Sequence, residues 1–240
     1  MIRHPITLLI MKKLLLEVAS DLNYFKMLVA SPKPEDLPLL EAAIAIGKVQ
    51  YPDMDIQEPL TIVDALAKRL AQRCVDAGTE IKRLREMSYF FYKEMGFAGN
   101  VNNFYDPDNS CIHQVLKTRR GIPITLAIIY AELARTIGLD VVGVSFPGHF
   151  MLKVNLHEGA VVLDPLTGYS FTKEDLYERI DGQPNDSLEP HLRAASSQET
   201  LMRMLRNLRE IYQQQGQDDK KQAVVDRMVI IQAAQAQASH

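Results

Sequence analysis

The chain has 240 residues, of which 47% are hydrophobic and 24% are charged, an ordinary globular composition with ample material for a core. The formal net charge of −3 gives no electrostatic support for binding to nucleic acid or to an anionic membrane, and we expect neither as a partner. Two cysteines, Cys74 and Cys111, are too few for a disulfide framework, which favours a cytoplasmic location.

An apolar run lies near the start of the chain, at Ile6–Met11. Lys12 and Lys13 interrupt it, so it falls well short of the roughly 20 apolar residues that span a bilayer. No small-residue cleavage pattern follows it, which argues against a signal peptide. We expect a helix packed on the domain, or residues upstream of the true start.

Residues 1–100 have the pattern of an N-terminal helical region that packs on a core. Apolar residues recur at steps of three and four over 38–45 and 62–71, which is the spacing of one helix face. A further helix is predicted over Ile81–Met95 and ends at Gly96.

Residues 101–182 differ in character and are predicted to form the core itself. The stretch 104–110 is dense in turn-forming residues and predicts an ordered loop. From Ile124 to Ile137 nearly every residue is apolar or small, and a helix that is apolar all round belongs in the middle of a domain. Pro123 suits the first turn of this helix and Gly138 its end.

Strands are predicted after this helix because the hydrophobic period changes. The short connections between the runs favour an antiparallel sheet, with His149 in one turn and Asp164 at the end of a strand. The predicted strands are Val141–Phe146, Phe150–Leu156 and Val161–Asp164.

The C-terminal part, residues 191–240, is predicted to be a helical hairpin. Two helical runs flank Gly216, which suits the connection between them. The stretch Gly182–Pro190 before the hairpin is polar and has the composition of a linker.

Pro123, His149 and Asp164 follow the order of a cysteine-protease-type site. In such a site a thiol at a helix start has a lowered pKa, a histidine takes its proton and a carboxylate orients the histidine. Proline has no nucleophile, so acyl transfer by this route is excluded at Pro123. Two ordinary alternatives stay open: His149 as a turn residue bonded to backbone, and Asp164 as the start of an Asp-Pro turn.

Four segments together resemble the SirB-type family of bacterial transglutaminase-like proteins, described as invasion-gene regulators, and also a domain of some eukaryotic F-box proteins. The resemblance covers about residues 35–180 and implies an α+β, papain-like fold. That fold has a buried central helix packed on a small antiparallel sheet, flanked by N- and C-terminal helices. It also implies that the hairpin is a short tetratricopeptide-like tail. The segments are Asn103–Ser110, Arg119–Leu126, Phe146–Phe150 and Leu163–Pro165.

The same resemblance assigns roles to three residues. Pro123 stands at the position of the nucleophile, and His149 and Asp164 match the base and its orienting carboxylate. The SirB-type pattern itself carries Gly-Ile-Pro, as at Gly121–Pro123, so the missing nucleophile is expected for this family.

Cys111 is the alternative nucleophile, at a predicted helix start with His113 two residues later. Residues at i and i+2 do not face one another on a helix, and a lone cysteine is most often a small buried hydrophobe.

Four further residues are candidates for binding a ligand or partner. Arg119 and Arg120 would flank the remnant cleft and bind an acidic group, and Asn103 and Tyr105 would line the same cleft. The ordinary alternatives are solvated surface charges for the arginines and bonds to loop backbone for the other two.

The sequence thus favours a non-catalytic, transglutaminase-like pseudoenzyme that binds a protein partner or regulates one. The alternative is a thiol hydrolase or acyltransferase that uses His149 and Asp164 with a relocated nucleophile such as Cys111. No metal or cofactor is expected, because the six histidines are scattered without zinc-ligand spacing and no Gly-rich phosphate loop occurs. The sequence predicts neither the identity of the partner nor the oligomeric state.

Overall fold

The computed structural model describes residues 21–30, 36–103, 105–180 and 187–238. Residues 21–29 are helical. The apolar run at Ile6–Met11 and most of the predicted linker lie outside the described residues. The α-helices that follow are α2 (Leu39–Ile46), α3 (Gln57–Arg73), α4 (Glu80–Ser88), α5 (Ile112–Thr118), α6 (Pro123–Arg135), α7 (Lys173–Arg179), α8 (Ser197–Gln214) and α9 (Asp218–Ala238).

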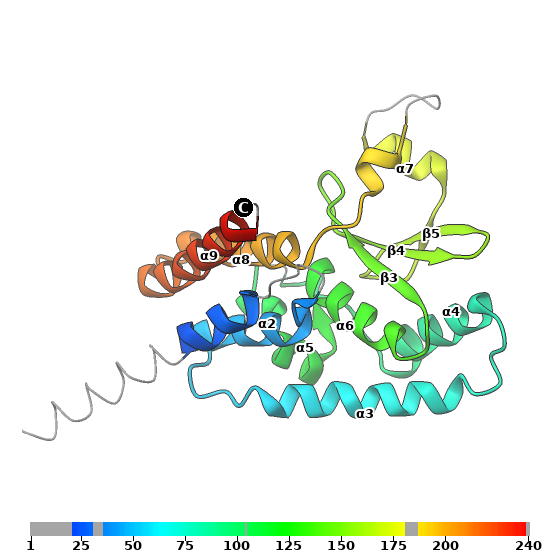
Figure 1. The fold of residues 1–240 in the computed structure, drawn as a ribbon, viewed down its shortest axis with the longest axis horizontal. Coiled ribbons are helices and arrows are strands. Elements are labelled where there is room, and N and C mark those ends of the chain that lie inside the picture. Colours follow the sequence, from blue (N-terminus) through cyan, green and yellow to red (C-terminus); the bar gives the residue numbers. More distant parts are fainter. Residues whose placement is uncertain (1–20, 31–35, 104, 181–186, 239–240) are drawn as a thin grey trace, which may run out of the picture.

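Short strands complete the structure, and the mixture of helices with small sheets confirms the predicted α+β class. Figure 1 shows the main sheet and the α8–α9 hairpin side by side above a layer of helices that includes α3 and α6. The strands are β1 (Ala98–Gly99), β2 (Arg120–Gly121), β3 (Asp140–Val144), β4 (Met151–Leu156), β5 (Gly159–Leu163) and β6 (Ser170–Phe171).

The main sheet is an antiparallel meander in the order β3-β4-β5-β6. Its register pairs Val144 with Met151 and Leu152 with Leu163, so the start of β4 lies next to the end of β5. The connections are short enough for neighbouring antiparallel strands, which is why the sequence pattern was informative here. β1 and β2 form a separate two-stranded parallel pair.

Helix α6 lies at the centre of the core. Pro123 occupies its first turn, where a missing backbone N–H does no harm, and Gly138 follows its end with φ of 72°. Tyr130 is fully buried on this helix, and its hydroxyl is 3.0 Å from Ser88 Oγ. The hydroxyl of Thr125 donates to Asn109 O at 2.8 Å and so ties the helix start to the preceding loop.

The helix predicted over Ile81–Met95 is not a uniform α-helix. It is α-helical as far as Ser88 and then continues as a π-helix over Tyr89–Glu94. Both Phe90 and Phe91 are fully buried, because the wider turn brings two adjacent side chains toward the core. Periodicity at 3.6 residues per turn does not reveal such a change.

The C-terminal hairpin is part of the same core as α6. The buried face of α8 includes Leu205 and Leu208, and Gly216, with φ of 66°, connects α8 to α9. The side chain of Gln50 accepts hydrogen bonds from Tyr212 Oη at 3.3 Å and from Lys220 Nζ at 2.7 Å. Among the described residues, no helix combines the length and the apolar character needed to cross a membrane.

Candidate functional site

A cleft of about 280 Å³ lies at the start of α6, and we call it the α6 cleft. It brings together residues from α6, from the turn between β3 and β4, and from α8, which are far apart in sequence. Its lining residues are Tyr105, Ile122, Pro123, Ile124, Gly148, His149, Phe150, Leu166, Arg203, Asn207, Glu210 and Ile211.

His149 and Asp164 are held next to one another by the sheet. His149 lies in the turn before β4, where Gly148 has φ of 69°, and its N–H donates to Phe146 O at 3.1 Å. Asp164 directly follows β5, the neighbour of β4. His149 Nε2 is 3.2 Å from Asp164 Oδ1, and each side chain is 19% exposed. The structure therefore brings these two residues together as the sequence order predicted.

Asp164 has a lowered pKa, although its burial alone would raise it. Hydrogen bonds from His149, from the Leu166 N–H at 2.9 Å and from the Thr167 hydroxyl at 3.2 Å outweigh that burial. The carboxylate is thus ionised near neutral pH and accepts from His149. A neutral His149 then carries its proton on Nε2 and leaves Nδ1 as an acceptor.

Pro123 lines the same cleft as His149. The pyrrolidine ring occupies the place at the helix start where a thiol would gain from the helix dipole. None of the residues lining the α6 cleft carries a thiol or an aliphatic hydroxyl. Within the described residues, the cleft therefore has His149 bonded to Asp164 and no nucleophilic side chain in its own lining.

Cys111 is not among the residues that line the cleft. It is 1% exposed, and its thiol donates to Pro107 O at 3.5 Å. Burial, together with the nearby Asp108 and Asp106, raises the pKa of Cys111 to about 12. A thiol in this environment stays protonated, whereas a nucleophilic thiol needs a lowered pKa.

His113, the residue that spacing pairs with Cys111, is also buried. Its ring lies edge-on to Tyr51 with 4.7 Å between the ring centroids. Burial lowers the pKa of His113, which makes the neutral imidazole the stable form. Cys111 and His113 thus contact different groups, Pro107 and Tyr51 respectively.

The sequence predicts that Arg119 and Arg120 flank the cleft, and neither is among the residues that line it. Arg119 has a left-handed backbone with φ of 61°, and its guanidinium lies over Phe97 at 4.7 Å from the ring centroid. Arg120 Nη1 donates to Gly96 O at 2.7 Å. Both side chains therefore serve the local packing around β2.

Of the other two predicted binding residues, one lines the cleft and one does not. Tyr105 lines the cleft and is 63% exposed. Asn103 does not line it, and its amide donates to Asp106 Oδ2 at 2.9 Å within the loop.

Helix α8 supplies cleft residues that the sequence did not point to. Arg203, Asn207 and Glu210 are spaced by four and three residues, which places them on one face. Arg203 Nη1 donates to Ser145 Oγ at 2.7 Å, and its guanidinium lies over Phe150 at 5.6 Å from the ring centroid. The spacing identifies a helix face, but only the tertiary structure shows that this face meets the cleft.

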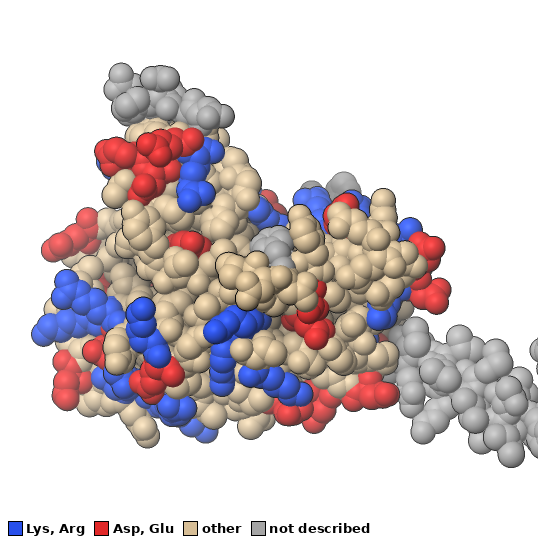
Figure 2. Space-filling view, turned by 180° about the vertical axis from the view of Figure 1, so that it is seen from behind, with Lys and Arg blue, Asp and Glu red and all other residues tan. Residues whose placement is uncertain are grey.

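Many of the charged side chains outside the cleft are exposed. Figure 2 shows Lys and Arg side chains interspersed with Asp and Glu over the lower part of the molecule. On α3, Arg69 and Arg73 pair with Glu94 at 3.0 and 2.7 Å. Within the described part of the chain, no group of three or more His, Cys, Asp or Glu side chains is arranged to hold a metal ion.

A family model and the sequences of bacterial relatives were compared with this chain, and both match it over most of its length. Residues 58–206 match the model of the transglutaminase-like superfamily. A UPF0162 protein of Xylella fastidiosa is 32% identical over 217 residues, which are 88% of this chain and 77% of that protein. A UPF0162 protein of Pseudomonas aeruginosa is 32% identical over 186 residues, 75% of this chain and 66% of that protein.

A shorter match extends to animals. Human F-box only protein 21 is 40% identical over 70 residues, which cover 29% of this chain and 11% of that protein. No solved structure matches the chain. On the strength of the superfamily match and the bacterial relatives, the chain belongs to the transglutaminase-like superfamily.

Proposed function

We propose that this protein is a non-catalytic transglutaminase-like protein that uses the α6 cleft to hold a segment of a partner protein, in a binding or regulatory role. The observation that carries the proposal is Pro123 facing the same cleft as His149, where catalysis would require a nucleophile. The resemblance to the SirB-type regulators supports the same view. A pseudoenzyme of this kind retains the shape of a substrate site without its chemistry.

The lining of the cleft suits a peptide segment. Ile124, Phe150 and Ile211 offer apolar surface, and a few convergent polar groups would fix the orientation of a bound chain. His149 Nδ1 would accept a hydrogen bond from a backbone N–H. The Arg203 guanidinium, half-buried and close to Phe150, would bind a carbonyl or carboxylate oxygen.

The C-terminal hairpin contributes to this proposal in two ways. α8 lines the cleft through Arg203 and packs into the core through Leu205 and Tyr212. We propose that the tetratricopeptide-like hairpin completes the docking surface. Deleting it would also remove core residues, so substitutions on its surface are the sharper test.

The hydrolase alternative rests on the paired His149 and Asp164, which would suit a general base. It needs a nucleophile, and the raised pKa and the position of Cys111 weigh against that thiol. If Cys111 nevertheless served, turnover of peptide amides or thioesters would require both His149 and Cys111. We expect the intact protein and its His149→Ala variant to show the same background hydrolysis.

Binding can be tested by photo-crosslinking in living bacteria. A photo-reactive side chain replaces Tyr105 at the cleft in the full chain, and a control carries it at Val75, which is 78% exposed. We expect discrete protein adducts from position 105 that are absent from position 75.

A second pair of variants asks whether the adducts depend on the cleft. Asn207→Trp would fill the cleft from α8, and Arg206→Trp places the same bulk on a neighbouring exposed position that does not line it. Adducts should disappear with the first substitution and persist with the second. Adducts that form equally from Val75, or that survive Asn207→Trp, would contradict the proposal.

A further inference from the structure

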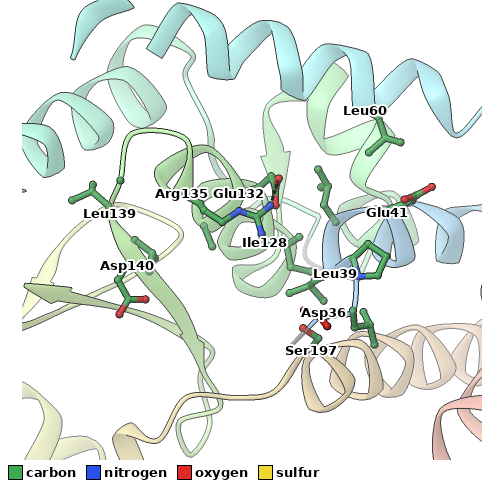
Figure 3. Close-up of a pocket in the computed structure, with 16 residues that line it drawn as sticks. Asp36, Leu39, Glu41, Leu60, Ile128, Glu132, Arg135, Leu139, Asp140 and Ser197 are labelled. Carbon is green, nitrogen blue, oxygen red and sulfur yellow. Dashed lines mark hydrogen bonds and ion pairs between the residues drawn. The ribbon is translucent and has the colours of Figure 1, made fainter. Parts of the chain in front are cut away.

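A second and larger cavity, of about 930 Å³, lies along the C-terminal half of α6, and we call it the α6 groove. Figure 3 shows its residues coming from α2, α3, α6, β3 and the start of α8. Ile128 and Ala131 of α6 contribute apolar surface, and Leu39 of α2 and Val141 of β3 line it from other elements. The groove and the α6 cleft share no lining residue.

One side of the groove is the outer edge of the main sheet. β3 is the first strand of the sheet and pairs with β4 on its other side. The segment before α8 covers only one end of this edge, where Val144 bridges Ala194 and the Ala195 N–H donates to Gly143 O at 2.8 Å. The chain then leaves the edge of β3, because α8 begins there: the Ser196 side chain accepts a hydrogen bond from the Glu199 N–H and caps the helix.

Within the described residues, the backbone of Val141 is therefore left at an open edge. Backbone groups of alternate residues in a strand point to the same side, so those of Val141 point in the same direction as the Gly143 carbonyl. Val141 also lines the groove. An open edge with unpaired backbone groups is a template for one more strand.

The rim of the groove is acidic. Among the described residues, Asp36, Glu41, Glu132 and Asp140 line it together with one cation, Arg135, which gives this lining a formal charge of −3. Arg135 is already paired with Glu132 at 2.5 Å, as Figure 3 shows. Asp140 and Glu41 lie on opposite sides of the groove in the same view.

From these features we propose that the α6 groove binds an extended, basic segment of a partner protein, which adds a short strand to the open edge of β3. The Val141 backbone would pair with the backbone of the incoming segment. Apolar side chains on one face of that segment would pack on Ile128 and Leu39. Lysine or arginine side chains on the other face would reach Asp140 and Glu41 by charge complementarity.

The test uses the full chain and a defined probe, a fluorescently labelled, end-blocked peptide of sequence Lys-Val-Lys-Val-Lys. One control peptide carries N-methyl groups on its valine amides, which removes strand pairing but keeps the charge. A second control replaces every lysine with glutamate. We expect saturable binding of the first peptide and a loss of about tenfold or more for the N-methylated one, the effect of losing one or two backbone hydrogen bonds. The glutamate peptide should not bind.

Substitutions in the protein locate the site. Val141→Pro removes one N–H at the open edge, and proline is tolerated at edge positions of sheets. It should weaken binding about as much as N-methylation, whereas Val141→Thr should not. Asp140→Asn should weaken binding about threefold, and Asp53→Asn, at an exposed position outside the groove, should leave it unchanged.

Three results would overturn the proposal. One is the absence of saturable binding up to about 1 mM peptide, which is beyond the range of specific recognition. Another is equal binding of the N-methylated peptide to the unsubstituted chain, a result that does not depend on how any variant folds. The third is a dimer, detected by light scattering, that Val141→Pro abolishes, because the occupant of the groove would then be a second copy of this chain.

Discussion

The two ends of helix α6 face cavities that differ in charge. The α6 cleft at its N-terminal end has Arg203 and His149 among its polar lining residues and a single carboxylate, Glu210. Among the described residues, the α6 groove along its C-terminal half has four carboxylates and one cation, Arg135. The helix dipole adds to this difference, since its N-terminal end favours negative charge and its C-terminal end favours positive charge. One buried helix thus borders two cavities that differ in charge, with a formally neutral lining at its N-terminal end and an acidic lining along its C-terminal half.

The largest expected effect comes from putting a thiol at the cleft end. Pro123→Cys should create a cysteine with a lowered pKa beside His149 at the N-terminus of α6. At pH 6 its alkylation by iodoacetamide should be on the order of 100-fold faster than that of a cysteine with an ordinary pKa. Mass spectrometry of the digested protein would measure the label at position 123 separately from any label on Cys74 or on buried Cys111.

The matched control for this experiment is the double variant Pro123→Cys, His149→Ala. Most of the rate gain should vanish in it, because the histidine would no longer hold the thiol proton. An unchanged rate in the double variant would show that the helix start and His149 are not a working pair.

A second prediction concerns a substitution in the loop that holds Asp164, at a position outside the α6 groove. A Cβ at Gly168 would lie 2.5 Å from the ring of Tyr92, at a position with φ of 75°. Tyr92 also donates to Pro165 O at 3.2 Å, so moving its ring strains the same loop. Gly168→Ala should lower the free energy of unfolding by about 3 kcal/mol in urea titrations.

The control Gly216→Ala separates the two causes of that loss, which are the close contact with Tyr92 and the backbone strain at positive φ. Gly216 has a similar φ of 66°, but nothing lies within 4 Å of an added Cβ. Only backbone strain remains there, and the expected loss is about 1 kcal/mol. Equal losses at the two glycines would mean that the contact with Tyr92 is unimportant.

A third prediction concerns pH. The pKa of Asp164 is lower in the folded protein than its ordinary value near 3.9, so its ionised form stabilises the fold above that value. The contribution is lost as pH falls through the lowered pKa of the folded state. Asp164→Asn should therefore cost about 1 kcal/mol of unfolding free energy at pH 7 and progressively less below pH 4. Chemical denaturation across this pH range, with Asp53→Asn as the control for removing a charge, would measure it. A difference that stays constant with pH would contradict the assignment.

The smallest effect is expected at the rim of the groove. Glu132 and Arg135 form an exposed ion pair, in which the Arg135 side chain is 73% exposed. Such pairs contribute little to stability, so Glu132→Gln should change the unfolding free energy by less than about 0.5 kcal/mol. Thermal unfolding at low and high salt would check this. A loss well above 1 kcal/mol would show that the rim is structural rather than available for a ligand.

The sequence predicted those features that depend on local pattern. The long apolar run gave α6 and its start at Pro123, and the short turns gave the adjacent strands that bring His149 beside Asp164. The resemblance to the SirB-type family then placed Pro123 at the position of the missing nucleophile. Each of these inferences needs only neighbouring residues or a hairpin-like connection.

The sequence alone did not indicate which segments line the cleft, because distant parts of the chain meet there. Arg119 and Arg120 are close to Pro123 in sequence, yet their side chains contact Phe97 and Gly96 instead of lining the cleft. Arg203 lines the cleft although it is about 80 residues away from Pro123 along the chain. No local pattern reports which face of α8 meets the start of α6.

The two hydrogen bonds of Gln50 have a consequence for the order in which the protein is made. They join residues that are 162 and 170 positions apart, so they form only after almost the whole described chain has been synthesised. Arg203 and Asn207 reach the α6 cleft through the same late segment. A ribosome-bound chain that ends before α8 would hold the paired strands but no finished cleft, so the binding that we propose for that site would begin only after the last helices fold.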